Sequence, residues 1–195
     1  MKKALLIMVC LISLLAVSTF AAAEELRIFI WSEYMDEISM PAEFEKLTGI
    51  QVRLNFYESN EEMMAKLQAG GVGQYDIVVP SDFIMPSLIN LKLLQPLDHG
   101  LIPNLKNMGA KFRTMSFDPG NRYSAGYQWG TIGLMYRKDR LSDSDVSTWA
   151  ILFDEHKTPG AFYLLDSVRE MLGITLLYLG YDFNTTRPRE LKAAA

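Results

Sequence analysis

The sequence predicts an α/β fold with a parallel sheet. Short apolar segments alternate three times with helical patterns within about 70 residues, as expected for strands joined by crossover helices. Two of these apolar segments, residues 26–30 and 76–80, run directly into a loop that holds an aromatic residue, a hydroxyl and an acid. Parallel strands end at the same sheet edge, so the two loops are expected to lie together.

The N-terminus has the features of a secretory signal peptide. Lys2 and Lys3 precede an apolar stretch at 4–20, which ends in Ala21-Ala22-Ala23. We expect cleavage after residue 23. Cys10 lies in this segment, so the mature protein would contain no cysteine and would depend on its core rather than on disulfides.

The charge of the mature chain narrows the class of partner. Without the two signal lysines it has 17 basic and 23 acidic side chains, a net charge of −6. This balance argues against a nucleic-acid partner and is compatible with cationic solutes. The mature length of about 170 residues predicts one domain or slightly more.

The first predicted strand, residues 26–30, is followed by a loop with Trp31, Ser32, Glu33 and Tyr34. Aromatic faces attract cations through their quadrupole, and a carboxylate offers charge-assisted hydrogen bonds. The loop therefore suits a ligand that is both cationic and apolar. An alternative is that the two rings only cap the core.

Caps and periodicity predict the next elements. Ser39 is expected to cap a helix that Gly49 ends, and residues 50–57 alternate as a strand. Ser59 and Glu62 form a capping box for a helix at 61–68. The third strand, 76–80, is expected to be buried and leads into Ser81-Asp82-Phe83 and then a helix at 85–91.

The second half of the chain is less regular. A turn is predicted at Asp118-Pro119-Gly120-Asn121 and another at 157–160. Strands are predicted at 123–127, 131–136 and 161–165, and helices at 149–153, at 168–179 and from about residue 186. Glu170 falls in the first turn of the long helix, where the residue pattern alone leaves a functional and a surface role open.

The residue pattern gives no indication of catalysis or of a metal. His99 and His156 are far apart and have no partner at ligand spacing, and the sequence has no nucleophile elbow, P-loop or zinc-helix motif. We therefore predict a protein that is not an enzyme and has no metal or cofactor.

Eight stretches along the chain carry a resemblance to a known family. They are IWSEY at 30–34, FEKLTGI at 44–50, YESNE at 57–61, YDIVVPS at 75–81, WGT at 129–131, LLDSVRE at 164–170, YLGY at 178–181 and NTT at 184–186. Together they resemble the polyamine-type periplasmic solute-binding proteins, the spermidine/putrescine receptors of bacterial ABC importers.

The resemblance implies a type II periplasmic-binding-protein-like fold with two α/β lobes and a hinge. It places an N-terminal lobe at 24–133, and a hinge crossover and an incomplete second lobe at 134–195. Family members continue beyond this point, so the chain is expected to be C-terminally truncated. Trp129 is expected to pack at the hinge.

The resemblance also implies roles for individual residues. Trp31 and Tyr34 would stack along the polymethylene chain, Phe83 holds a position often occupied by Tyr, and Glu170 would bind an ammonium group. The polar cleft positions are Ser32, Glu33 and Ser81. Ser167 departs from the pattern because some relatives have an acid there, which leaves the preferred ligand length open.

The function implied is periplasmic binding of a polyamine by a monomer that delivers it to the membrane permease of an ABC importer. Two alternatives stay open. One is a receptor of the same fold for another small solute, such as an amino acid, a sugar or an anion. The other is a truncated product without a transport function.

Overall fold

The computed structural model describes residues 24–157 and 160–195. The predicted signal peptide and part of the predicted turn at 157–160 lie outside these residues. The chain forms two compact units, one up to Gln95 and one from Pro96 onward. The lobe boundary expected near residue 133 remains a prediction.

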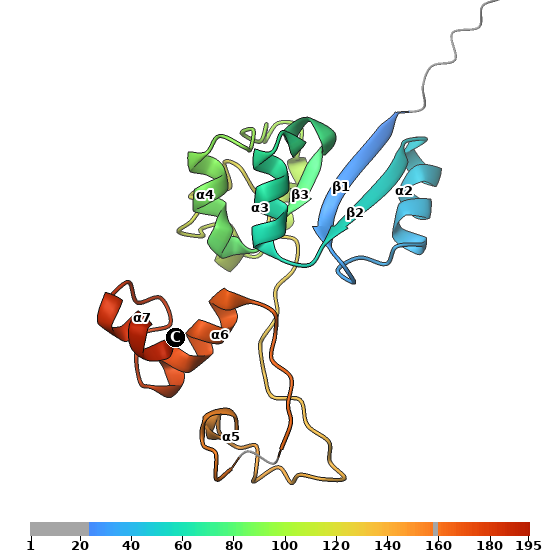
Figure 1. Cartoon of the computed structure of the whole chain (residues 1–195). Helices are drawn as coiled ribbons and strands as arrows, with labels where there is room; N and C mark the ends of the chain where they lie inside the picture. Colours follow the sequence, from blue (N-terminus) through green and yellow to red (C-terminus); the bar gives the residue numbers. More distant parts are fainter. Residues whose placement is uncertain (1–23, 158–159) are drawn as a thin grey trace, which may run out of the picture. The chain divides into compact units, whose positions relative to one another are not determined.

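The first unit contains a three-stranded parallel sheet (Figure 1). Its strands are β1 (Glu25–Trp31), β2 (Gln51–Tyr57) and β3 (Ile77–Val79), in the order β2-β1-β3. In the register, Ile30 lies between Phe56 and Val79, and Trp31 lies opposite Tyr57. All three strands therefore end at one edge, as the sequence predicts.

Five helical elements follow the strands of this unit, and the longest of them, α2, comes after β1. They are α2 (Ser39–Thr48), α3 (Asn60–Gln68), the 3₁₀ turns at Gly71–Gln74 and Asp82–Ile84, and α4 (Met85–Asn90). The predicted cap of α3 is confirmed because the Ser59 Oγ accepts a hydrogen bond from the Glu62 N–H at 3.1 Å. The Glu62 carboxylate accepts from the Glu58 N–H at 3.0 Å instead of from Ser59. Gly49 ends α2 with φ 77°, a conformation that favours glycine.

The prediction that Ser39 caps α2 is wrong. Ser39 is the first helical residue, and the Asp36 carboxylate accepts hydrogen bonds from the N–H groups of Ile38 and Ser39 at 3.0 and 2.8 Å. An ionised carboxylate is a stronger acceptor than a hydroxyl, and negative charge is stabilised at a helix N-terminus. A hydrogen bond from the Ser39 hydroxyl, followed by these two from the backbone, lowers the pKa of Asp36.

The buried apolar residues of this unit come mainly from β1, α3 and α4. Phe29 is fully buried, stacking on Tyr75 at 4.3 Å and meeting Tyr57 edge-on at 4.9 Å between ring centroids. The other buried apolar residues are Ile28, Ile30, Met63, Leu67, Met85 and Leu88. The prediction that the third strand is buried is wrong: β3 is an edge strand, and Ile77 is exposed.

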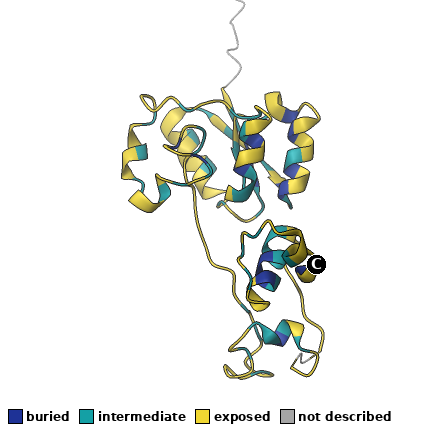
Figure 2. Ribbon diagram, turned by 90° about the vertical axis from the view of Figure 1, so that its left-hand side faces the viewer, coloured by how far each residue is buried: buried dark blue, intermediate teal, exposed yellow. Residues whose placement is uncertain are grey.

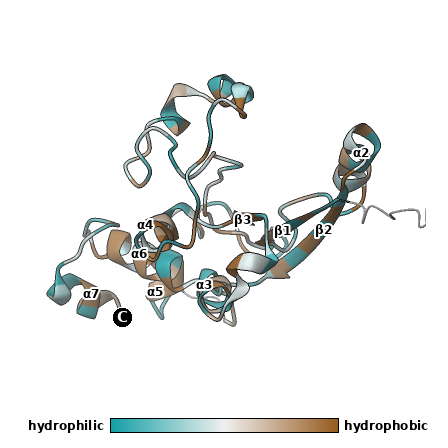
Figure 3. Ribbon diagram, turned by 90° about the horizontal axis from the view of Figure 1, so that it is seen from above, coloured by the Kyte–Doolittle hydropathy of each residue, from teal (hydrophilic) through white to brown (hydrophobic). Residues whose placement is uncertain are grey.

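The second unit is built from short helices joined by extended chain. They are the 3₁₀ turns Pro103–Asn107 and Ala110–Phe112, α5 (Ala150–Phe153), α6 (Val168–Tyr178) and α7 (Pro188–Ala194). Figure 3 shows hydrophobic stretches along α6, whose Gly173 lies directly against the Phe183 ring. None of the helices in the described ranges has the length and apolar character needed to cross a membrane.

The predicted turn at 118–121 is confirmed, with positive φ at Gly120 and Asn121 and a hydrogen bond from the Asn121 N–H to the Asp118 carbonyl at 3.1 Å. The three strands predicted in this half are wrong, because residues 123–127, 131–136 and 161–165 contain no strand. A strand needs a neighbouring strand to pair with, and the strand pairs in the described part of the chain, β1–β2 and β1–β3, do not include these segments.

Candidate functional site

The loop after β1 brings two aromatic rings together. The Trp31 and Tyr34 ring centroids lie 6.0 Å apart, and the Tyr34 N–H donates to the Trp31 carbonyl at 3.4 Å. Between them Glu33 adopts φ 62°, an uncommon conformation for a residue other than glycine. Glu33 and Tyr34 are exposed, whereas Trp31 and Ser32 are half-buried. The rings and the carboxylate are therefore available at the sheet edge.

Tyr57, the last residue of β2, connects this loop to β3. Its ring centroid lies 5.0 Å from that of Trp31, and its hydroxyl donates a hydrogen bond to the Val79 carbonyl. Tyr57 is 1% exposed, and this burial raises the pKa of its phenol. The Trp31 Nε1–H lies near the Tyr57 hydroxyl, yet no group in the described residues accepts a hydrogen bond from it.

Asn60, at the start of α3, connects the same region to the loop after β3. Its Nδ2 donates to the Ser81 Oγ at 3.0 Å, and its Oδ1 accepts from the Ser81 N–H at 3.1 Å. Asn60 is 2% exposed, so these hydrogen bonds are shielded from water. Phe83, two residues after Ser81, is half-buried in the 3₁₀ turn Asp82–Ile84.

The carboxylate of Glu58, directly after β2, contacts the loop that follows β1. The Ser32 Oγ donates to Glu58 Oε2 at 3.1 Å. Glu58 is exposed, as are Glu33 and Asp82, so three acids lie in the loops that follow the three strands. This distribution favours a cation over an anion.

Six of the eight predicted site residues thus lie at or just after the ends of β1 and β3 in the first unit: Trp31, Ser32, Glu33, Tyr34, Ser81 and Phe83. Tyr57, Glu58 and Asn60, which contact Trp31, Ser32 and Ser81 in turn, were not predicted from the sequence. The signal was available because these residues lie at the end of β2 or just after it, and the rule that ligands bind at strand ends applies to all three strands.

Ser167 and Glu170 belong to the second unit, at the start of α6. Ser167 is the N-cap residue but its side chain makes no capping hydrogen bond. Glu170 is half-buried, and its Oε2 atom is buried without a hydrogen-bond donor from the described residues. A buried carboxylate oxygen without a donor is costly, so it is suited to receive one from a ligand.

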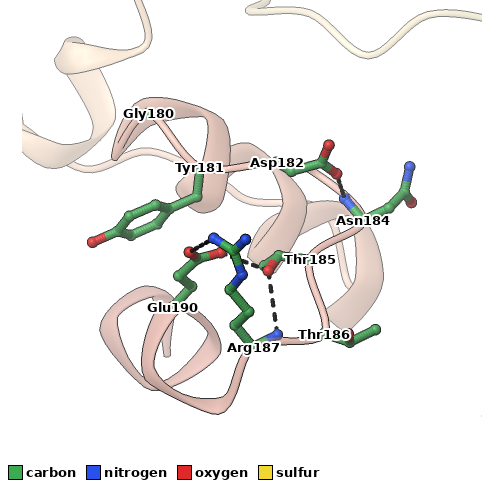
Figure 4. A pocket seen from close by; sticks show the side chains of 8 residues that line it. All are labelled: Gly180, Tyr181, Asp182, Asn184, Thr185, Thr186, Arg187 and Glu190. Carbon is green, nitrogen blue, oxygen red and sulfur yellow. Dashed lines mark hydrogen bonds and ion pairs between the residues drawn. The ribbon is translucent and has the colours of Figure 1, made fainter.

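A separate shallow pocket of about 480 Å³ lies around the start of α7 (Figure 4). Arg187 and Glu190 form an ion pair across it at 2.9 Å, and Thr185 also donates to Glu190. These two contacts, led by Thr185, lower the pKa of Glu190. The pocket contains none of the predicted site residues, and its arginine and glutamate neutralise each other. In the described part of the chain, no three metal-ligating side chains gather at one point.

Comparison with solved structures supports the fold. A putative spermidine/putrescine ABC transporter protein from Listeria monocytogenes is 39% identical, with a TM-score of 0.76 over 88% of this chain and 52% of that one. A spermidine/putrescine ABC transporter substrate-binding protein from Streptococcus pneumoniae is 35% identical, with a TM-score of 0.69. The predicted periplasmic-binding-protein-like α/β fold is confirmed by these likenesses and by the parallel sheet.

Sequence relatives agree with the solved structures. The putrescine/cadaverine-binding protein of Pseudomonas aeruginosa is 36% identical over 100% of this chain and 55% of its own length. The spermidine/putrescine-binding periplasmic protein of Escherichia coli is 36% identical over 87% of this chain and 48% of its own. The chain therefore spans about half the length of the curated relatives it matches. Residues 39–195 match the family model for bacterial extracellular solute-binding proteins, and the chain belongs to that family.

Proposed function

We propose that this chain supplies part of a receptor that binds a polyamine outside the cytoplasm. The observation that carries the proposal is the Trp31–Tyr34 ring pair beside the Glu33 carboxylate at the end of β1. Relatives named for putrescine, cadaverine and spermidine binding support this choice of ligand.

To bind a polyamine, the site must replace the water around a slender cation. The methylene groups of a polyamine would lie against the rings of Trp31, Tyr34 and Phe83. An ammonium group that leaves water needs new hydrogen bonds, which Glu33 and Ser32 can accept. Glu170, with its unpaired buried oxygen, would accept a further ammonium hydrogen bond, with Ser167 beside it as the weaker polar contact. Ser81 is positioned by Asn60 to contribute its hydroxyl.

The proposed location and partners of the protein follow from the family. We propose a monomer, exported by a signal peptide at 1–23 and active in the periplasm, which delivers its ligand to the membrane permease of an ABC importer. It performs no catalysis and binds no nucleic acid. The two lobes would close on the ligand by a hinge motion, with each half coupled to the same solute.

The Trp31 indole provides a direct test. The full chain has three tryptophans, so ¹⁵N labelling gives three indole signals, and Trp31→Phe identifies one of them. We expect putrescine and spermidine to shift the Trp31 signal, whereas 1-butanol, glutarate and sodium chloride at equal ionic strength do not. The titration should extend to about 10 mM, where even a 1 mM site would be mostly occupied.

Glu33→Gln removes the charge and retains the shape. It should weaken diamine binding by about tenfold, which corresponds to one charge-assisted hydrogen bond. Glu43→Gln is the matched control, because Glu43 is an exposed glutamate of α2 away from the strand ends. A Trp31 signal unmoved by diamines would reject the polyamine site. A shift with an amino acid or sugar alone would favour a receptor for another solute.

A further inference from the structure

The hydrogen bond between Ser32 and Glu58 has a fixed direction. The Ser32 Oγ lies 3.1 Å from Glu58 Oε2, and an ionised carboxylate has only acceptor oxygens, so the hydroxyl is the donor. A serine hydroxyl has one hydrogen and two lone pairs. While this contact holds, Ser32 can accept a hydrogen bond from a ligand but cannot donate one to it.

The strand register brings these two side chains together. Trp31 and Tyr57 are the last pair of the parallel ladder between β1 and β2. Ser32 and Glu58 are the next residues on the two sides. Figure 2 shows that the buried residues of this unit lie mostly in its strands and helices, whereas Glu58 is exposed. Its backbone is nevertheless held, because Tyr57 before it is buried and its own N–H donates to the Glu62 carboxylate at 3.0 Å.

Ser81, which follows β3, is held in the opposite sense. Its N–H donates to the Asn60 Oδ1 at 3.1 Å, which identifies the other atom of that amide as the donor Nδ2. This Nδ2 donates to the Ser81 Oγ at 3.0 Å, so the contact does not use the hydroxyl hydrogen of Ser81. Of these two serines, Ser32 is the one restricted to accepting.

The aromatic rings of the site do not distinguish one kind of ammonium group from another. A ring attracts a cation through its quadrupole, whether or not the cation carries an N–H. The Trp31–Tyr34 pair would therefore attract a quaternary ammonium group as well. A hydroxyl that can only accept gains a hydrogen bond from a primary or secondary ammonium group and none from a quaternary one. The Ser32 hydroxyl thus supplies a selectivity that the rings lack.

We infer that Glu58 is a positioning residue that holds Ser32 as an acceptor and thereby makes the site select ammonium groups with N–H over quaternary ones. Glu58 acts through Ser32 and need not touch the ligand itself. This role rests on the proposed function, in which the loop after β1 binds a polyamine. Within that function it defines a chemical class: primary and secondary amines are accepted, and quaternary ammonium ligands are rejected.

Two substitutions of Glu58 separate its acceptor oxygen from its charge. Glu58→Gln and Glu58→Leu both remove the charge, but only the glutamine retains an oxygen that can accept from Ser32. The ligands are putrescine and its permethylated bis-quaternary counterpart, which has the same chain and the same charge but no N–H. Each is titrated into the full 195-residue chain, with the Trp31 indole signal as the readout.

The expected result is a loss confined to the ligand that carries N–H groups. Wild type should bind putrescine at least about tenfold more tightly than the bis-quaternary ligand, which corresponds to one charge-assisted hydrogen bond. For putrescine, Glu58→Gln should stay within about threefold of wild type, because a screened surface charge contributes little, and Glu58→Leu should be about tenfold weaker. For the bis-quaternary ligand, the two variants should agree within about twofold.

Two further variants serve as controls. In a Ser32→Ala background, Glu58→Gln and Glu58→Leu should bind putrescine equally, since the hydroxyl through which Glu58 acts is gone. Glu61→Leu removes the charge of an exposed glutamate in α3 and should leave the ratio of the two affinities unchanged. Urea unfolding of each variant checks that it folds, and Glu58→Ala replaces Glu58→Leu if the latter does not.

The role of Glu58 can fail while the polyamine site stands. Equal weakening of both ligands by Glu58→Leu overturns this role, and so does a difference between the Glu58 variants that persists without the Ser32 hydroxyl. A wild type that binds the two ligands equally well overturns it too. A Trp31 signal that neither ligand moves rejects both the polyamine site and the role of Glu58.

Discussion

The side chain of Asn60 bonds both the hydroxyl and the backbone N–H of Ser81, residues that are 21 positions apart in the sequence. One buried amide thus fixes the start of α3 against the end of β3. Tyr57, three residues before Asn60, contacts the Trp31 ring and donates a hydrogen bond to the Val79 carbonyl of β3. The Asn60–Ser81 contact therefore helps to fix the position of Ser81 relative to the Trp31 ring.

Asn60→Ala should destabilise the first unit by about 1–3 kcal/mol, because it leaves the Ser81 N–H without its acceptor in a part-buried position. Urea unfolding followed by circular dichroism measures the change. The control is Asn104→Ala, at an exposed asparagine of the second unit. A loss of less than about 0.5 kcal/mol would show that water replaces the amide without cost.

The buried Tyr57 phenol should resist ionisation. Because burial raises its pKa, the native protein at pH about 11 should give the same phenolate absorbance with and without Tyr57→Phe, although free phenols ionise near pH 10. In unfolding concentrations of urea, where the ring is no longer buried, Tyr57→Phe should lower the absorbance change by one tyrosine. A smaller signal in native Tyr57→Phe would contradict the burial of this ring.

The Arg27–Asp76 pair should make stability depend on pH at the acidic end. Two side-chain hydrogen bonds from Arg27, at 3.0 and 3.1 Å, and one from its N–H lower the pKa of Asp76. A lowered carboxyl pKa gives stability that is present above the unfolded value of about 3.9 and is lost as the pH falls through the folded value. The urea midpoint of Asp76→Asn should therefore be below wild type at pH 7, and the difference should shrink as the pH falls below the unfolded value of about 3.9. A constant difference would exclude the charge as the cause.

Gly173→Ala should destabilise the second unit. A Cβ there would lie 2.0 Å from a ring carbon of Phe183, so the ring must move or the helix must shift. Overpacking of this kind costs about 1–3 kcal/mol, measurable by thermal unfolding. Gly133→Ala is the control, since a Cβ at that glycine meets nothing within 4 Å. Adding Phe183→Leu to Gly173→Ala should recover part of the loss, and no recovery would point to a backbone cause.

The first unit could be predicted well because its signals are local. The apolar run of β1, the Ser59 cap and Gly49 each indicate structure within a few residues. Ser39 was assigned wrongly because Asp36, three residues earlier, is the better acceptor. The Asn60–Ser81 contact could not be derived, since it joins separate elements and Asn60 looks like an ordinary helix start.

The second unit was predicted less well for a different reason. Residues 131–136 and 161–165 have the composition of strands, but pairing depends on neighbours that a local pattern does not contain. The helices α5 and α6 were predicted nearly to their bounds because their hydrogen bonds are internal. The unpaired oxygen of Glu170 likewise has no signature in the sequence.

In the strand order β2-β1-β3, the contacts that join the Trp31–Tyr34 ring pair to Tyr57, Tyr57 to Val79 and Asn60 to Ser81 all lie within residues 31–81. At synthesis rates of about 5–20 residues per second, this stretch is complete seconds before the end of the chain is made. These contacts therefore need no residue made after Ser81, and they can form without α6.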